Sequence, residues 1–441
     1  MIPNSVLLRH HLLALLLCVL LASPWAALQA DTRPASTAKA NQLLSPNQLV
    51  RSVWQHNQSI RAMQAATDAA SARSDAAGAL DDPLVSYMVA PNTAGDPHQG
   101  LNQNIQISQK FPWPGTLRLR NRAAKAEEES ANQLTTDLRL RLAALAHAAY
   151  AQWYYVHRAV AINAENIELV THRRAVAQAA YASGQAPQQD VLQAEVELLR
   201  LQNQTLDLAR LQRNVQVQIN TLQNLAPDTV VPPPADLPRE ISLPTTAVLQ
   251  EAALAHSPLL QGLNARIDAN QDRVDLAHKS YYPNTSLLAG YNSMMDMPAK
   301  RLTVGVAINI PFGGNHRGEV GEANARLYES EAKLADTRNQ LVSDIDQTHA
   351  NATQAAAMIH LYQDKLLPLT QLNMQAAEAD YSSGSGDFLK LTQAEQQYLT
   401  AKLELVRARA DFFTQIASLN YQTGGSLWSP LGSATSQDAT P

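Results

Sequence analysis

Apolar residues recur at alternating spacings of three and four along two segments of the chain, 187–225 and 387–422. In the first segment this seam runs from Val191 to Leu222 with two polar exceptions, and the positions 200 residues later repeat it, again with two polar exceptions. A mean spacing of 3.5 residues is typical of helices that pack along a coiled-coil seam. The pattern therefore predicts two long helices, each packed against another helix.

Longer Ala-, Gln-, Leu- and Arg-rich segments precede these two helices, at 116–182 and 315–382. A continuous helix of that length would approach roughly 100 Å, so each long segment and the helix after it predict an extended helical hairpin. Pro368 lies inside the second segment and should break or kink it, because proline lacks a backbone N–H. A further helix of about thirty residues is predicted before each hairpin, at 46–80 and 245–280.

Short stretches of alternating hydrophobicity lie between the first helix and the hairpin in each half. From Leu302 to Ile310 every second residue is apolar, which is the pattern of a strand with one apolar face. Residues 101–111 show a weaker version, with glutamines on the apolar face. Turn-forming loops at 91–100 and 293–300 make each pair of strands a β-hairpin, so four strands are predicted.

The two halves of the chain repeat at an offset of 200 residues. The matches are Tyr181 with Tyr381, Gln193 with Gln393, and, one residue out of register, 111–115 with 310–314. A collinear series of this kind indicates tandem duplication. The predicted organisation is a first repeat at 31–225, a Pro-rich linker at 226–244, a second repeat at 245–422 and a flexible tail at 423–441.

The N-terminal residues match a secretory signal peptide, which we assign to 1–30. Arg9 precedes an apolar run from Leu12 to Leu21, and small residues follow. Cys18, the only cysteine, lies inside this run behind leucines rather than the small residue that a lipoprotein signal needs. The exported chain would then have no cysteine, and hence neither disulfides nor a thiolate metal site.

Charge and hydropathy restrict the partners of the exported chain. Removing Arg9 with the signal takes the net charge from −5 to about −6, which argues against a nucleic-acid partner. No later apolar run approaches the roughly 20 residues of a spanning helix, so a membrane crossing would need strands. Four strands cannot close a barrel, whereas three copies would supply twelve. The alternative is a small soluble sheet beside a helical bundle.

The order of helix, β-hairpin, long helix and return helix, present twice, resembles the TolC-type outer-membrane efflux proteins over nearly the whole exported chain. The most specific features are the Tyr-x-Ser-Gly turns followed by Gln-Ala-Glu. A second feature, Ser-Gln-Lys-Phe-Pro-Trp-Pro-Gly at 108–115, leads into a helix and is similar to the branch that contains the Czc- and Cus-type heavy-metal efflux channels.

The resemblance implies a mainly α protein with a small β part. Three chains would form a homotrimer with a long periplasmic α-barrel and a shared 12-stranded transmembrane β-barrel in outer-membrane lipid. It would be a passive exit duct without cofactor or catalytic residues, working with a periplasmic adaptor and an inner-membrane pump of the resistance-nodulation-division class. The cargo would be heavy-metal cations. Alternatives are a duct for drugs or type I protein secretion, or a periplasmic structural coiled coil or adaptor.

The hairpin tips are the candidate functional sites that the resemblance implies. The residues expected to contact the adaptor are Tyr181, Ser183, Gly184, Tyr381, Ser383 and Gly384. Acidic residues just after the turn would narrow the channel entrance, and Asp190 fits this role. In the second repeat Lys390 stands at the corresponding position and Asp387 lies slightly earlier. A carboxylate ring would favour cations; alternatively, the two aspartates simply stabilise the first turn of a helix.

Three methionines, Met294, Met295 and Met297, crowd the loop of the second β-hairpin. Thioether sulfur suits Cu(I) or Ag(I), but this loop would lie beyond the transport step, and an ordinary loop is the favoured interpretation. The sequence has no His-Glu-x-x-His, Gly-x-Ser-x-Gly, P-loop or Rossmann motif. It therefore predicts neither an enzyme nor a cofactor site.

Overall fold

The computed structural model describes residues 43–90, 103–238, 242–293, 295 and 297–427. The expected signal peptide, the loop at 91–100, Met294 and most of the expected tail lie outside the described residues. The elements below belong to one unit that starts at Leu43. Most of the described residues are helical and the strands form a single four-stranded sheet, so the predicted mainly α class with a small β part is confirmed.

The two helices predicted ahead of the hairpins are each divided into two, so the prediction of one continuous helix was wrong. The bounds are α2 Pro46–His56, α3 Gln58–Ala77, α6 Thr246–His256 and α7 Pro258–Lys279. Asn57 and Ser257 adopt extended backbone at the breaks, and each side chain accepts a hydrogen bond from an N–H of the following helix. Both residues are thus N-caps, which begin a new helix in a new direction.

The predicted helical hairpins are confirmed. The first consists of α4 Thr116–Ala182 and α5 Gln188–Leu222, and the second of α8 Asn315–Leu361, α9 Leu367–Ser382 and α10 Phe388–Gln422. A π-helical turn, Tyr362–Leu366, joins α8 to α9 just before Pro368. This wider turn accommodates the missing proline N–H, so the helix continues instead of breaking. The first hairpin has no such turn.

The four strands form one antiparallel sheet in the order β1-β2-β3-β4. Their bounds are β1 Leu84–Val89, β2 Gln103–Phe111, β3 Asn284–Asn292 and β4 Leu302–Asn309. The pairs β1–β2 and β3–β4 are the predicted hairpins, and the pair β2–β3 joins the two halves of the chain. Among the described residues neither β1 nor β4 has a partner strand on its outer edge.

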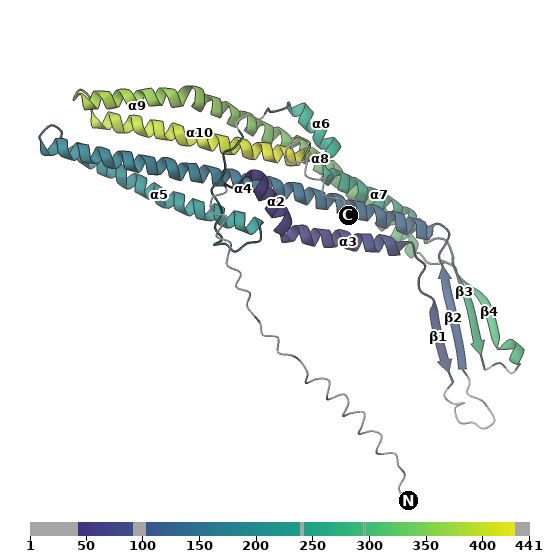
Figure 1. Cartoon of the computed structure of the whole chain (residues 1–441). Helices are drawn as coiled ribbons and strands as arrows, with labels where there is room; N and C mark the ends of the chain where they lie inside the picture. Colours follow the sequence, from purple (N-terminus) through teal and green to yellow (C-terminus); the bar gives the residue numbers. More distant parts are fainter. Residues whose placement is uncertain (1–42, 91–102, 239–241, 294, 296, 428–441) are drawn as a thin grey trace, which may run out of the picture. The chain divides into compact units, whose positions relative to one another are not determined.

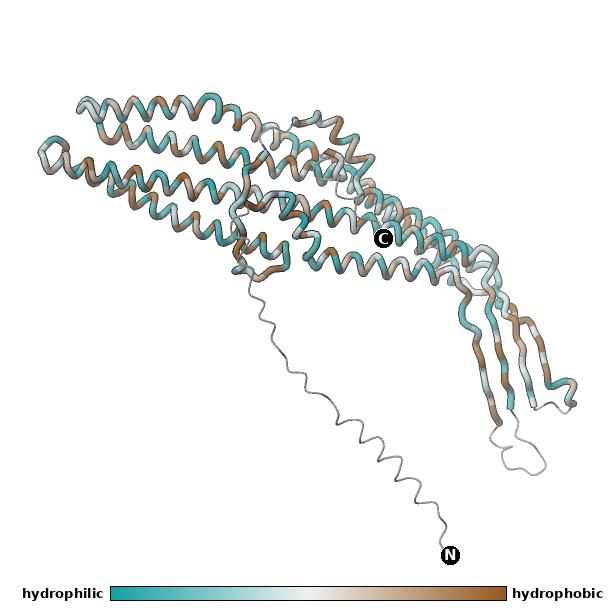
Figure 2. The backbone as a smooth tube through the Cα atoms, viewed as in Figure 1, coloured by the Kyte–Doolittle hydropathy of each residue, from teal (hydrophilic) through white to brown (hydrophobic). Residues whose placement is uncertain are grey.

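One face of this sheet is apolar across all four strands. The register aligns Val85 with Ile107, Ile107 with Ala289, and Ala289 with Val304. Val304 is 81% exposed, Val85 63% and Ile107 46%, so no described residue covers this face at these positions. Figure 2 shows apolar and polar residues mixed along the strands, as period-two alternation requires.

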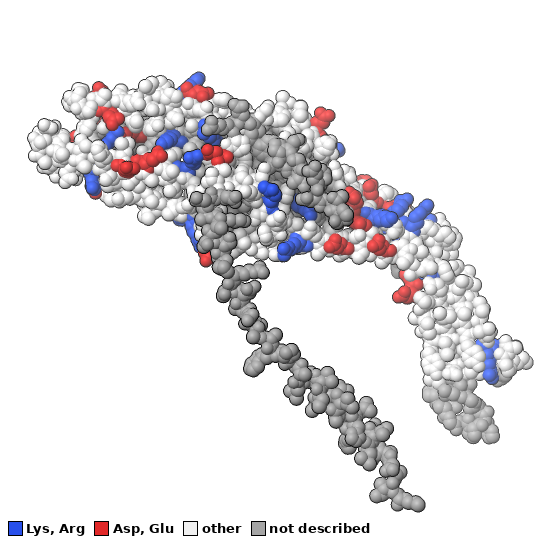
Figure 3. All heavy atoms as spheres, viewed as in Figure 1, with Lys and Arg blue, Asp and Glu red and all other residues white. Residues whose placement is uncertain are grey.

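The opposite face of the sheet is mostly polar, although Leu84, Met88 and Leu288 also lie on it. Ser86 aligns with Gln106, Gln106 with Gly290, and Gly290 with Thr303. On the side of the molecule seen in Figure 3, charged side chains gather over the helices, while most of the sheet surface is uncharged. The sheet is thus two-faced, with amides and hydroxyls on one side and branched apolar residues on the other.

Helix α4 is the centre of the helical part and packs against α2, α3, α5, α7 and α10 (Figure 1). Its aromatic residues hold the Pro-rich linker. The Trp153 indole N–H donates to the carbonyl of Pro232 at 2.9 Å, and the Tyr150 hydroxyl lies 2.7 Å from the carbonyl oxygen of Ala235. Both rings belong to the main apolar core. The linker is therefore fixed on α4 although it has no regular structure.

The segment expected to begin the flexible tail starts with packed turns. Thr423 is fully buried, and Leu427 packs against the cluster around Leu249 and Ile345. Among the described residues no helix combines the length and the apolar composition that crossing a bilayer requires.

Candidate functional site: the paired hairpin tips

The tips of the two helical hairpins have the same backbone. Gly184 and Gly384 adopt left-handed conformations, with φ of 72° and 76°. In each tip the glycine N–H donates to the carbonyl of the tyrosine three residues earlier, Tyr181 or Tyr381. A glycine with positive φ commonly ends a helix in this way. The repeated Tyr-x-Ser-Gly sequence is thus explained by the reversal of the chain at each tip.

The side chains of the two tip tyrosines differ in their surroundings. Tyr181 is 47% exposed. The neighbouring Ser183 and Gly184 are exposed as well. Tyr381 is half-buried and its ring contacts Phe388 edge-on, with 5.4 Å between centroids. Ser383 and Gly384 are exposed in the second tip, so of the six residues expected to contact the adaptor only Tyr381 is half-buried.

Asp190 links the two hairpins. It lies in the first turn of α5 and is buried, and its Oδ2 accepts a hydrogen bond from the Tyr381 hydroxyl at 3.3 Å. Burial raises the pKa of the Asp190 carboxyl and the nearby Asp387 raises it further, whereas the hydrogen bond from Tyr381 lowers it. Burial and the neighbouring Asp190 carboxylate also raise the pKa of Tyr381. The two residues are thus electrostatically coupled.

Asp387 is the second aspartate that the sequence placed near the channel entrance. It is the N-cap of α10, and its Oδ1 accepts a hydrogen bond from the backbone N–H of Leu389 at 3.0 Å. Lys390 is exposed in the first turn of the same helix. Both aspartates thus occupy helix-stabilising positions, Asp387 as a cap and Asp190 in the first turn of α5, and Asp190 also contacts the opposite hairpin.

A small apolar cluster surrounds the Tyr381–Asp190 hydrogen bond. Ala177, Ala194 and Phe388 are buried in it, with Val191 and Tyr381 packed against them. These residues come from both hairpins, so the tips are in contact. The cluster partly shelters the hydrogen bond from water, which strengthens the coupling of the two polar groups.

Farther from the tip, polar side chains again join the hairpins. The Gln396 amide donates to Glu197 at 2.7 Å, and Lys402 forms an ion pair with Glu165 at 2.7 Å. Nearer the tip, Arg173 of α4 pairs with Glu395 of α10, and both side chains are nearly buried at 11% and 13% exposure. Arg173 also reaches Glu378 at 3.4 Å. A buried ion pair of this kind is costly to break from one side.

Sequence reasoning did not identify these linking residues. The repeated Gln-Ala-Glu motif contained a signal, because Glu395 is its last residue, but the equivalent Glu195 pairs with Arg174 inside the first hairpin at 3.0 Å. Equal positions in the two repeats therefore have different partners. Periodicity alone cannot reveal which of the two crosses between hairpins.

Of the methionine loop the structure describes Met295 and Met297. Met297 is exposed at 58% and Met295 at 39%. No group of three or more His, Cys, Asp or Glu side chains that could hold a metal occurs among the described residues.

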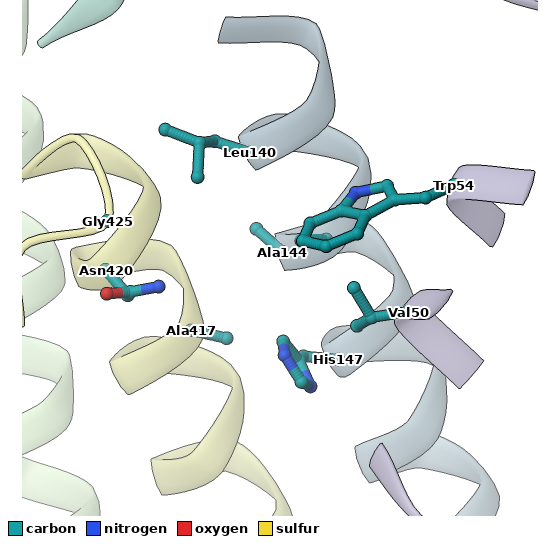
Figure 4. A pocket seen from close by; sticks show the side chains of 9 residues that line it. Val50, Trp54, Leu140, Ala144, His147, Ala417, Asn420 and Gly425 are labelled. Atoms are coloured by element: carbon teal, nitrogen blue, oxygen red, sulfur yellow. The ribbon is translucent and has the colours of Figure 1, made fainter. Parts of the chain in front are cut away.

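A cavity of about 50 Å³ lies where α2, α4 and α10 meet, lined by side chains such as Val50, Trp54 and His147 (Figure 4). Its volume leaves room for a few waters at most, so it is not a site for an organic ligand. His147 is 2% exposed and its ring contacts Phe413 edge-on at 5.5 Å. Burial lowers the pKa of His147 to about 4.

Comparisons with known proteins agree with this arrangement. The sequence model of the outer membrane efflux protein family matches residues 249–425. The alkaline protease secretion protein AprF of Pseudomonas aeruginosa is 24% identical over 195 residues, which cover 42% of this chain. The match spans only 40% of the length of that relative.

Solved structures share the fold over most of the chain. The outer-membrane channel OprN has a TM-score of 0.75 at 20% identity, covering 87% of this chain and 90% of its own. VceC of Vibrio cholerae has a TM-score of 0.73 at 19% identity, and the match covers 87% of this chain and 97% of VceC. CusC has a TM-score of 0.73 at 15% identity, and the match covers 86% of this chain and 92% of CusC. The second half of the chain is thus similar to the outer membrane efflux protein family, and the described fold is that of these channels.

Proposed function

We propose that this protein is the outer-membrane exit duct of a tripartite efflux system. In this proposal residues 1–30 direct export, the two repeats build the wall of the duct, and the helical part lies in the periplasm. The duct conducts its cargo passively, and the energy comes from a pump in the inner membrane.

The observation that carries the proposal is the two-faced sheet, whose outer strands β1 and β4 have no partner strand among the described residues. An apolar face that no described residue covers suits lipid, and a face rich in amides and hydroxyls suits a water-filled lumen. Unpaired strand edges are not tolerated in hydrocarbon, so in this proposal β1 of one copy pairs with β4 of another. Three copies, the number that the resemblance implies, would give twelve strands and one closed wall, and the proposed assembly is therefore a homotrimer.

The hairpin tips are the proposed periplasmic entrance. Asp190 and Tyr381, together with the Arg173–Glu395 pair, would hold the second hairpin against the first and keep the entrance narrow. Separating the hairpins exposes these groups to water and widens the entrance. The exposed tip residues Tyr181 and Ser183 are the proposed contacts for a periplasmic adaptor.

Two cargo classes are supported by different observations. The segment at 108–115 and the fold shared with CusC support the heavy-metal branch, with cations as cargo and a pump of the resistance-nodulation-division class. The sequence match to a protease secretion protein supports organic cargo, including secreted polypeptides. The charge of the duct wall, considered below, bears on this choice.

The function is tested by purifying the exported chain and measuring its mass and its conductance. We expect a trimer that needs detergent and forms discrete channels in planar lipid bilayers. A monomer that stays in solution without detergent, or a protein that never conducts, would rule out the duct.

A further inference from the structure

The residues of the four strands include a single charged side chain, Lys110, and no carboxylate. Lys110 aligns with Ser286 of β3, and Ser108 and Gln106 precede it on the polar face. Its neighbours Gln109 and Phe111 belong to the other face. Alternation along β2 therefore assigns the Lys110 side chain to the polar side of the sheet.

Lys110 is exposed, and among the described residues it forms no ion pair. It lies at the end of β2 that leads into α4, where Asp81 and Asp82 precede β1. Asp81 is 4.0 Å from Arg120 and so has a cationic neighbour of its own. Asp82 is exposed outside the sheet. The charge of Lys110 is thus not neutralised by direct contact.

We propose that Lys110 is a selectivity-determining residue that faces the lumen and makes the strand-lined section of the duct favour anionic and neutral cargo over free cations. The proposal rests on the proposed function, because it needs the polar face to enclose a lumen. Twelve strands about 4.8 Å apart and tilted by about 40° form a ring of roughly 24 Å diameter between backbones. Three lysine side chains reaching inwards bring their ammonium groups within about one Debye length, 10 Å at 0.1 M salt, of a particle on the axis.

A ring of three lysines, with no carboxylate in the strands themselves, attracts anions and repels bare metal ions. The exposed Asp82 carboxylates outside the sheet reduce this effect. The amides and hydroxyls around it can bind neutral groups through hydrogen bonds. Of the two cargo classes, organic molecules and polypeptides with neutral or negative groups are therefore favoured. Free divalent cations would meet a barrier at this level of the duct.

A cysteine reporter next to Lys110 tests the local charge. The chain has a single cysteine, Cys18. In a Cys18→Ala background, Ser108→Cys therefore introduces the only thiol that can react. Ile107→Cys is the matched control on the other face of the sheet. Trimers in liposomes are treated with anionic sulfonatoethyl and cationic trimethylammonioethyl methanethiosulfonates, with and without Lys110→Gln. We expect Ser108→Cys to react and Ile107→Cys to be protected by lipid.

The ratio of the anionic to the cationic reaction rate at Ser108→Cys is the decisive value. A unit charge about 7 Å away, two residues along a strand, changes this ratio roughly threefold at 0.1 M salt. We expect Lys110→Gln to lower the ratio by that factor and Asp82→Asn to raise it or leave it unchanged. If Ser108→Cys reacts and Ile107→Cys does not, but Lys110→Gln leaves the ratio unchanged, the role of Lys110 is refuted while the duct is not. Equal reaction of Ser108→Cys and Ile107→Cys overturns the duct itself.

Discussion

The hydroxyl of Tyr381 donates a hydrogen bond to Oδ2 of Asp190, across 191 residues of sequence, at 3.3 Å. It joins the tip of the second hairpin to the first turn of the return helix of the first. The bond is partly sheltered by Phe388 and two alanines. If the tips form the entrance of a duct, this contact opposes its opening.

Removing the Tyr381 hydroxyl should therefore promote opening. Tyr381→Phe keeps the ring contact with Phe388 but loses the donor to a buried carboxylate, a loss of about 1.5–3 kcal/mol for a charged hydrogen bond. We expect more frequent opening in planar bilayers and faster entry of large solutes. Tyr181→Phe, the corresponding change at the exposed tip, should leave both unchanged; equal effects of the two variants would exclude a specific role for the hydrogen bond.

Acid should favour the closed tips. Burial and Asp387 raise the pKa of Asp190 in the packed state, whereas separated tips would return it to the ordinary value of about 3.9. Packed tips therefore bind the proton more tightly, and they gain stability as the pH falls through the raised pKa toward 3.9. Opening recorded between pH 7 and 4 should decline, and Asp190→Asn should remove this decline. An increase in opening on acidification would contradict the mechanism.

The Arg173–Glu395 ion pair should contribute more to the free energy of unfolding than the Arg174–Glu195 ion pair. Arg173→Gln leaves a nearly buried carboxylate without its countercharge, which costs about 2–3 kcal/mol, below the value for full burial. Arg174→Gln breaks a pair with 36% and 45% exposed side chains and should cost under about 1 kcal/mol. Urea unfolding in detergent measures both. Exchanging the charges as Arg173→Glu with Glu395→Arg, in a Glu378→Gln background that removes the second carboxylate near Arg173, should recover part of the loss. No recovery there would indicate that packing, not pairing, matters.

His147 should make the helical part sensitive to acid. Its pKa is lowered to about 4 in the folded chain and is about 6.5 when unfolded, so the unfolded chain binds the proton first. Stability is full above pH 6.5 and declines toward pH 4, by up to about 3 kcal/mol. His147→Leu should remove that part of the decline in urea unfolding, whereas a change at the exposed His360 should not. An unaltered pH profile in His147→Leu would refute this assignment.

The strongly periodic elements could be predicted from the sequence. Helices α4, α5 and α10 end within a few residues of their expected bounds, because long seams and glycine turns define them locally. The divisions at Asn57 and Ser257 were missed because a single capping residue inside an Ala-rich segment is a weak signal. Pro258 marked the second division, but proline at the first position of a helix is also common.

The links between the hairpins could not be predicted in this way. Arg173 and Glu395 are more than 200 residues apart, and their contact depends on which faces of the two hairpins meet. Asp190 was singled out by its distance from the turn glycine, yet its partner Tyr381 was expected to contact an adaptor rather than the other hairpin. The partners of these residues are determined by how the two hairpins pack together. The local sequence pattern does not contain that information.

The most direct test of the duct compares two adjacent substitutions in β4. Val306→Lys places a charge on the apolar face and Ala307→Lys places the same charge on the polar face. A lysine facing lipid costs about 2–4 kcal/mol near the middle of a bilayer, whereas a lysine facing the lumen does not. We expect Val306→Lys trimers to fail to insert into liposomes, while Ala307→Lys trimers insert and conduct. Equal insertion of the two variants would contradict the account.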